Sequence, residues 1–151
     1  MAAATASPRF GDIAIGHTLP PLDIPLTRTL IVATALASRD YTEVHHDAEI
    51  AVQRGSKDIF MNILSTNGFV GRFITDWAGP DAILRKVSIR LGAPNYPGDT
   101  MHLTGTVTAL DPTSHTVEVA VRGANDLGDH VTGTVVVELP TDHAPSGGGA
   151  P

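Results

Sequence analysis

The hydrophobic pattern changes its period at Gly79-Pro80, and this change restricts the fold more than any other feature of the sequence. Residues 59–77 carry apolar side chains at spacings of mainly three, four and one, which predicts one long helix buried on a wide face. Within it, Gly68 and Gly71 would let the helix approach a sheet, because they have no side chains. After Gly79-Pro80, residues rich in Val, Ile and Thr alternate as in strands, over 83–91, 101–110, 115–122 and 130–139.

Shorter elements precede the long helix. Prolines interrupt residues 13–26, which predicts extended chain or an edge strand. Thr27 can cap a helix over residues 28–38, and Asp47 can begin a short second helix that Gly55 would end. Turn-forming residues separate the later strands, so an antiparallel meander is the simplest topology. The sequence therefore predicts an α+β fold in which a curved antiparallel sheet wraps around a long central helix.

Length and composition suit one domain. The chain has 151 residues, of which 42% are hydrophobic, and this is enough for a single core. We assign the domain to residues 11–140 and expect flexible ends at 1–10 and 141–151, which are small, polar or rich in Gly and Pro. No apolar run approaches the roughly 20 residues that span a bilayer, and the features of a signal peptide are missing. We therefore expect a cytoplasmic protein with no membrane partner.

Residue usage excludes several functions. The chain has no cysteine, which removes disulfides, thiolate catalysis and iron-sulfur clusters. Ten Lys and Arg stand against sixteen Asp and Glu, for a net charge of −6. The basic residues form no cluster longer than Arg85-Lys86, so a nucleic acid partner is not expected, because binding phosphates requires concentrated positive charge.

Ionisable side chains are densest between the two predicted early helices. Asp40 and His45 lie five residues apart there, in a loop of the kind that carries catalytic groups on a rigid scaffold. His46 must point away from its neighbour and is expected at the surface. His45, His46 and Asp47 have neither i,i+4 spacing nor a well-placed third ligand, so no metal site is predicted. The other histidines are scattered singly and are expected to be solvated or hydrogen-bonded: His17, His102, His115, His130 and His143.

This loop resembles the Ser-Gly-Asp-x-Asn-Pro-[Leu/Ile]-His-x-Asp motif of the MaoC-like hydratases, with the Asp-to-His spacing intact. The matching run is Ser38-Arg39-Asp40-Tyr41-Thr42-Glu43-Val44-His45-His46-Asp47. Further markers of the family follow in the expected order over residues 15–139: Gly16-His17-Thr18-Leu19-Pro20, Pro97-Gly98-Asp99-Thr100, and Asn125 with Gly128. Arg39 replaces the motif's Gly and Thr42-Glu43 its Asn-Pro, which alters the expected loop geometry. The resemblance implies a hotdog fold.

The resemblance is strongest to the small MaoC-like subunit of heteromeric enoyl-CoA hydratases of actinobacterial steroid side-chain degradation. Arg39-Asp40-Tyr41 and Gly55-Ser56-Lys57-Asp58-Ile59-Phe60 carry it. It implies reversible hydration of a trans-2-enoyl-CoA with a bulky, steroid-type acyl group, and a hotdog dimer, here a hetero-oligomer with a larger MaoC-like subunit. Coenzyme A belongs to the substrate of such an enzyme, and no separate cofactor is expected.

Asp40 and His45 suit this chemistry. Hydration requires water to lose a proton as it attacks Cβ while Cα gains one, and a neutral imidazole can accept that proton while an ionised carboxylate orients the water. The developing oxyanion needs donors, which the unpaired N–H groups at the start of the long helix can supply.

The start of that helix departs from the family pattern Ile-Val-His-Gly-Met-Leu. Aligning apolar positions places Met61-Asn62 at the family's His-Gly, whereas an ungapped count from His45 places Asn62-Ile63 there. Asn62 and Ile63 are therefore the candidate substrate-positioning residues, and the Asn62 amide either assists the chemistry or caps the helix. Two other functions fit the sequence: an acyl-CoA thioesterase, which has no requirement for His45, and a non-catalytic subunit that completes a partner's acyl pocket.

Overall fold

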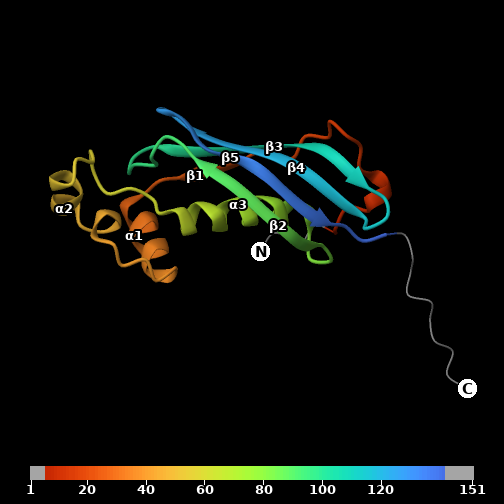
Figure 1. The fold of residues 1–151 in the computed structure, drawn as a ribbon, viewed down its shortest axis with the longest axis horizontal. Coiled ribbons are helices and arrows are strands. Elements are labelled where there is room, and N and C mark those ends of the chain that lie inside the picture. Colours follow the sequence, from red (N-terminus) through yellow and green to blue (C-terminus); the bar gives the residue numbers. More distant parts are fainter. Residues whose placement is uncertain (1–5, 142–151) are drawn as a thin grey trace, which may run out of the picture.

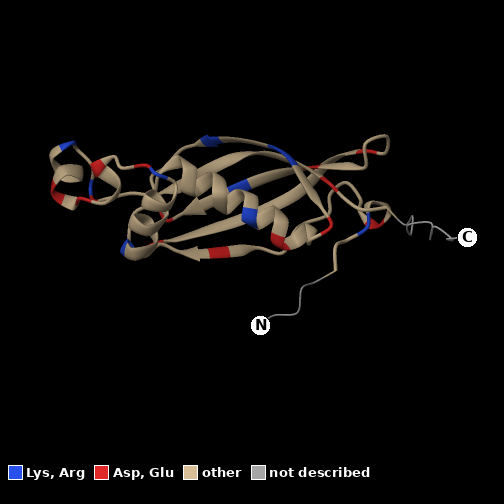
Figure 2. Ribbon diagram, turned by 90° about the horizontal axis from the view of Figure 1, so that it is seen from below, with Lys and Arg blue, Asp and Glu red and all other residues tan. Residues whose placement is uncertain are grey.

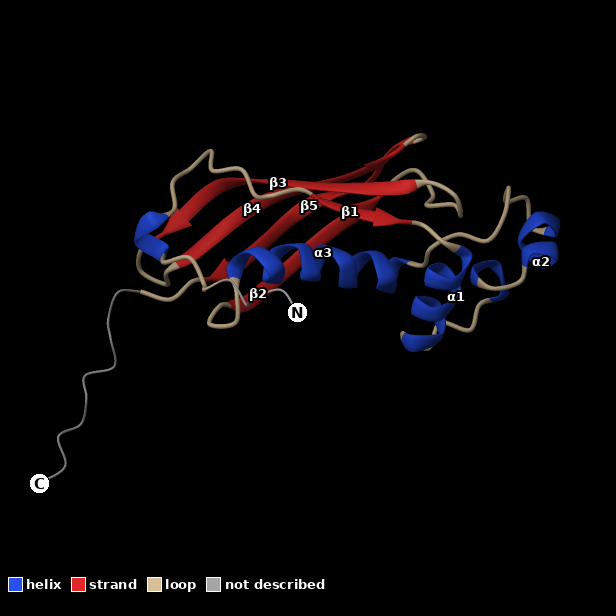
Figure 3. Ribbon diagram, turned by 180° about the vertical axis from the view of Figure 1, so that it is seen from behind, coloured by secondary structure: helices blue, strands red, loops and turns tan. Residues whose placement is uncertain are grey.

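The computed structural model describes residues 6–141 and confirms the α+β hotdog fold. A five-stranded antiparallel sheet with the order β1-β3-β4-β5-β2 curls around the helix α3, Ile63–Ala78 (Figure 1). The strands are β1 Leu22–Pro25, β2 Ile83–Leu91, β3 Thr100–Asp111, β4 Thr116–Asn125 and β5 Gly128–Glu138. Viewed from behind, α3 runs along the sheet, and α1 (Arg28–Ala37) and α2 (Ala48–Gln53) lie together beyond its N-terminal end (Figure 3).

The sheet topology differs from the predicted meander. Strands β3, β4 and β5 do form one, but β2 pairs with β5, at Val87↔Val135, and so occupies the far edge of the sheet. The early extended segment accounts for this order, because β1 takes the free side of β3 through pairs such as Ile24↔Met101. An edge position also suits Pro25, the last residue of β1, which has no N–H to donate.

The two early helices begin as predicted. Thr27 Oγ1 accepts a hydrogen bond from the Leu30 N–H at 3.0 Å, and Asp47 caps α2 in the same way through the N–H groups of Glu49 and Ile50. Two short 3-10 turns, η1 (Phe10–Asp12) and η2 (Glu43–His45), complete the helical elements of the described chain. Gly55 adopts a positive φ of 88° just after α2, which agrees with its expected role in ending that helix.

The long helix starts later than its hydrophobic period suggests. Residues 59–62 are not helical, and α3 begins at Ile63 with Asn62 as its N-cap. The backbone N–H groups of this segment bond to neighbouring chain instead: Phe60 N–H donates to Val44 O at 3.3 Å, and Met61 N–H donates to Asn95 O at 3.0 Å. The side chains of Ile59 and Met61 are nevertheless buried. This explains why the apolar pattern of the sequence begins before the helix does.

The core lies between α3 and the concave face of the sheet, with Phe73 almost fully buried at its centre. A strand glycine allows this close packing, since a Cβ added at Gly105 would lie 2.9 Å from the Phe73 ring and 3.0 Å from Val119. The prediction for the helix glycines was wrong. Gly68 faces open space, and a Cβ at Gly71 would only reach Leu84 at an ordinary 3.8 Å.

The described part of the N-terminal stretch packs against the domain. Ser7 is buried, and its hydroxyl accepts a hydrogen bond from the Asp81 N–H at 3.0 Å. The ordered chain thus begins before residue 11, whereas residues 1–5 and 142–151 of the predicted flexible ends lie outside the described residues. The positions of Lys and Arg along the ribbon are dispersed among those of Asp and Glu (Figure 2). No helix in residues 6–141 is both long enough and apolar enough to cross a membrane.

Candidate active site

Arg39 directs the chain from α1 toward the site. It adopts a left-handed conformation with φ 58°, while the Arg39 N–H donates to Leu36 O and the Asp40 N–H donates to Ala35 O, both at 3.0 Å. This pair of bonds is a Schellman motif, which normally places glycine at the left-handed position. The replacement of the motif's Gly by Arg39 therefore preserves the loop geometry, at a conformational cost of roughly 1 kcal/mol.

His45 is buried with a defined tautomer. It ends η2, and its ring nitrogen Nδ1 lies 2.7 Å from the carbonyl oxygen of Phe60. Because a carbonyl can only accept, Nδ1 carries a proton, and Nε2 is the ring nitrogen that exchanges its proton. That Nε2 lies 3.4 Å from Asp40 Oδ2, and the Phe60 ring packs edge-on against the imidazole with centroids 5.0 Å apart. The structure thus brings the two predicted residues together.

The Asp40 carboxylate is held by donors on both oxygens. Asn62 Nδ2 donates to Oδ2 at 2.9 Å, and the Thr42 N–H donates to Oδ1 at 3.3 Å. The Asn62 amide is the main cause of a pKa of Asp40 below its ordinary value, and the bonds from Thr42 add to the effect. With its side chain 21% exposed, Asp40 is an ionised carboxylate at neutral pH that water can still reach.

Asn62 caps α3, one of the two roles that the sequence left open, and its amide also contacts Asp40. Its Oδ1 accepts a hydrogen bond from the Ser65 N–H at 3.0 Å and caps α3, and this fixes the amide so that Nδ2 faces Asp40. The same Nδ2 donates to Ser38 Oγ at 3.0 Å, and Ser65 Oγ donates to Asn62 Oδ1. Sequence reasoning missed Ser38 and Ser65. An Asn just before an apolar helix is an N-cap signal, but no local pattern indicates what its second amide atom contacts.

Free backbone donors lie at the start of α3. The Ser65 and Thr66 N–H groups are taken by the side chain and the carbonyl of Asn62, whereas Ile63 and Leu64 occupy the first two helical positions, where an N–H has no acceptor within the helix. Ile63 is also 52% exposed. Of the two predicted positioning residues, Asn62 contacts Asp40 directly, and Ile63 follows it as the first residue of α3.

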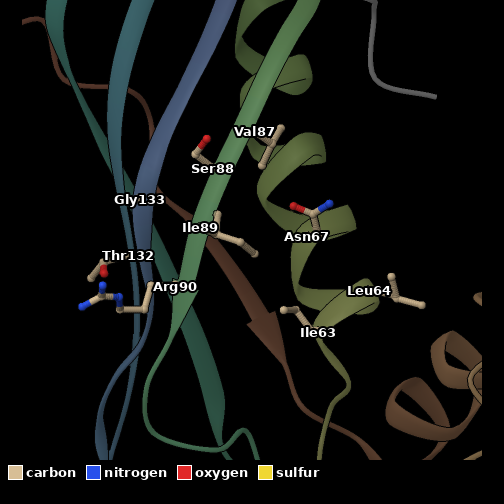
Figure 4. A pocket seen from close by; sticks show the side chains of 9 residues that line it. All are labelled: Ile63, Leu64, Asn67, Val87, Ser88, Ile89, Arg90, Thr132 and Gly133. Atoms are coloured by element: carbon tan, nitrogen blue, oxygen red, sulfur yellow. The ribbon is translucent and has the colours of Figure 1, made fainter.

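An open hollow of about 700 Å³ lies between the start of α3 and the edge strand β2 (Figure 4). The Ile63, Val87 and Ile89 side chains line it from two elements, with Asn67 adding a polar group. A second hollow of about 360 Å³ lies on the α1 side of the same helix turn, and Leu64 borders both. Asp40 and His45 line neither hollow, but Ser38 and Ser65, which both hydrogen-bond Asn62, line the smaller one.

The other described histidines do not join the Asp40–His45 pair, and His143 lies outside the described residues. His46 is exposed as expected, and its Nε2 donates to the Tyr41 carbonyl at 3.2 Å. His102 pairs with Asp23 at the surface, whereas His130 is buried and hydrogen-bonded. In residues 6–141, no three His, Asp or Glu side chains converge in a way that could hold a metal ion.

A hotdog layer with an Asp/His pair before the central helix defines a MaoC-like protein, and comparison with known proteins supports this class. No protein-family model matches the chain. It is 50% identical, over 83% of its length and 95% of the relative's, to the 3-oxo-4,17-pregnadiene-20-carboxyl-CoA hydratase beta subunit of Mycobacterium tuberculosis.

Two solved structures share the fold. A chain of the ChsH1-ChsH2 complex from Mycobacterium tuberculosis superposes with a TM-score of 0.81 and 48% identity, covering 83% of this chain and 98% of that one. An unliganded R-hydratase from Pseudomonas aeruginosa gives a TM-score of 0.82 at 20% identity, covering 90% and 88%. The chain belongs to the MaoC-like hydratase family and, within it, groups with the beta subunit of the mycobacterial hydratase.

Proposed function

We propose that this chain is the catalytic small subunit of an enoyl-CoA hydratase, a hydro-lyase that adds water reversibly to a trans-2-enoyl-CoA and forms the 3-hydroxyacyl-CoA. One observation carries the proposal: His45 Nε2 and the Asp40 carboxylate lie 3.4 Å apart, and the Asn62 that contacts Asp40 caps the helix whose first N–H groups have no acceptor within it. A base, a water-orienting carboxylate and an oxyanion donor are the groups that this reaction needs.

The reaction balances with these groups alone. His45 Nε2 removes a proton from a water that Asp40 orients, and the water oxygen forms a bond to Cβ. The π electrons of the double bond move toward Cα and the thioester carbonyl, where the Ile63 N–H, with Asn62 at the same helix start, stabilises the negative charge. The imidazolium then returns its proton to Cα. No separate cofactor takes part, since coenzyme A is a portion of the substrate.

A bulky acyl group and a larger partner subunit belong to the same proposal. The mycobacterial relative is named for a pregnadiene carboxyl-CoA, and the similar structure is of a two-component complex. In this chain the β2 edge is not paired within residues 6–141, and Ile83, Leu84 and Leu91 expose apolar surface along it. The adjoining hollow is open on this side, so a second, larger hotdog subunit placed at β2 would close it around the substrate.

The test uses the purified chain with and without its larger subunit, and Asp40→Asn and His45→Ala made in this chain only. Loss of enoyl thioester absorbance measures hydration with short, long and steroid-like CoA substrates, and a thiol reagent measures released CoA. We expect both variants to lose about 10²- to 10⁴-fold in kcat. Undiminished turnover would mean that this chain is a non-catalytic subunit, and CoA release that depends on Asp40 but not on His45 would indicate a thioesterase.

A further inference from the structure

A buried polar pair lies under the first turn of α3. Thr66 and His130 are both almost inaccessible, at 0% and 2% exposed. Their side chains contact each other, with Thr66 Oγ1 2.8 Å from His130 Nε2. Burying such groups costs free energy that well-packed apolar residues would not, so the directional contact between them needs its own explanation.

The donor at each position of this pair can be assigned. His130 Nδ1 lies 2.6 Å from the Ala93 carbonyl oxygen, which can only accept, so Nδ1 carries a proton. Burial also lowers the pKa of His130, which keeps the ring neutral and leaves a lone pair on Nε2. The Thr66 hydroxyl lies 3.3 Å from the Asn62 carbonyl oxygen but only 2.8 Å from His130 Nε2, so its single proton is donated to His130. The connection thus runs in one direction from α3 through β5 to the loop that follows β2.

This connection is one of several attachments between the site segment and that loop. At one end, the Met61 N–H donates to the Asn95 carbonyl at 3.0 Å. At the other, Thr66 reaches Ala93 through His130, and the Thr66 N–H closes the first helical turn on the Asn62 carbonyl at 3.2 Å. The peptide between these attachments includes the Asn62 carbonyl and the Ile63 N–H, the proposed oxyanion donor.

We infer that Thr66 and His130 are positioning residues for the oxyanion site, because they hold the first turn of α3 at a fixed depth and rotation relative to the loop at 92–95. Apolar packing is not directional and allows a helix to slide by fractions of an ångström. A buried hydrogen bond to a strand prevents such sliding, because it is directional. Catalysis is sensitive to displacements of this size. The inference rests on the proposed hydratase function and assigns a role to two residues remote from the Asp40–His45 pair.

The test compares Thr66→Val, which removes the hydroxyl at nearly constant shape, with Thr66→Ser, which keeps it. Thr75→Val is the matched control, since Thr75 is exposed on the same helix and its hydroxyl bonds only within the helix, to Arg72 O. For the chain assembled with its larger subunit, we expect Thr66→Val to lower kcat about 10- to 100-fold with KM changed less than about twofold. The kcat values of Thr66→Ser and Thr75→Val should remain within about threefold of the value for the unmodified chain.

A spectroscopic measurement separates positioning from general damage. In an Asp40→Asn background, which slows turnover, an enoyl-CoA labelled with carbon-13 at the thioester carbonyl reports hydrogen bonding to its oxygen through the infrared stretching frequency. We expect the downward shift on binding to be largely lost in Thr66→Val and retained in Thr66→Ser. An unchanged frequency in Thr66→Val, or equal losses for Val and Ser, would overturn the inference.

His130 provides the same comparison if Thr66→Val does not fold. His130→Gln keeps a donor and an acceptor and should retain the carbonyl shift better than His130→Leu; equal behaviour of the two would contradict the inference. Failure of the proposed function and failure of this inference give different results. A chain without hydratase activity toward any enoyl-CoA would refute the proposed function itself, whereas an active chain indifferent to the hydroxyl at residue 66 would refute only this inference.

Discussion

Replacing Asn62 by Ala should separate the stability of the α3 cap from the electrostatics of the site. The substitution removes the acceptor for the Ser65 N–H, which costs about 1 kcal/mol for an N-cap. It also removes the donor at 2.9 Å from Asp40, a charge-assisted bond that we place near the low end of its range, at about 1.5 kcal/mol, because Asp40 is partly exposed. The free energy of unfolding at pH 7 should therefore fall by roughly 2–3 kcal/mol.

The pH dependence follows from the same bond. Asn62 holds the pKa of Asp40 below its ordinary value in the folded chain, so this contribution is complete above the unfolded pKa and is lost as the pH falls through the folded pKa. Urea unfolding should thus show a smaller effect of Asn62→Ala in acid, where only the cap term of about 1 kcal/mol remains, than at pH 7. The acidic limb of kcat/KM should move to higher pH, since Asp40 then protonates more easily.

Asn62→Asp is the matched variant. Aspartate caps helices as well as asparagine does, but a second carboxylate beside Asp40 raises the pKa of Asp40 through like-charge repulsion. We expect it to keep more of the cap stability than Asn62→Ala and to move the acidic limb further upward. An acidic limb that coincides in the unmodified chain and both variants would refute the role of Asn62 in controlling Asp40.

Four other substitutions test the fold and the assembly. Arg39→Gly should stabilise the chain by up to about 1 kcal/mol in urea unfolding, because glycine adopts the left-handed conformation without strain; destabilisation would contradict the Schellman geometry. Gly68→Ala should raise the free energy of unfolding by about 1 kcal/mol, because alanine favours the helix more than glycine does. Gly105→Ala should lower it by about 1–3 kcal/mol, because the added methyl group clashes with Phe73. Equal urea midpoints for the two variants would contradict this packing. Leu91→Asp on the β2 edge should weaken association with the larger subunit at least about tenfold, because a charged carboxylate would lose its water in the interface. Titration followed by size-exclusion chromatography measures this association. Unchanged association would show that β2 does not form the interface.

The candidate site was partly accessible from local sequence because its main residues share one short loop. Asp40 and His45 are five residues apart, so their proximity needs only the turn that follows a helix. The protonated nitrogen of His45, however, depends on the Phe60 carbonyl fifteen residues away, and Ser38 reaches Asn62 from another helix. No periodicity records such contacts, because they depend on how separate segments lie in space.

The helix start shows a similar division. The apolar run from Ile59 predicts burial correctly, but burial does not distinguish a helix from an extended segment that pairs with the loops at Val44 and Asn95. Likewise Gly68 and Gly71 have the composition expected at a close approach, whereas the approach occurs at Gly105 in the sheet. A hydrophobic pattern indicates which side of a helix or strand is buried. The element that packs against that side determines which of its residues must be small.

The order of elements, the change of period and the spacing of Asp40 and His45 were determined by the chain itself, because each depends on residues close together in sequence. Tertiary structure alone decided that β2 crosses to the edge beside β5, that Asn62 joins the helix cap to Asp40, and that Thr66 meets His130. These features arise where segments far apart in the chain compete for the same hydrogen-bonding partners and the same volume. The outcome of that competition depends on the whole fold, which no local pattern contains.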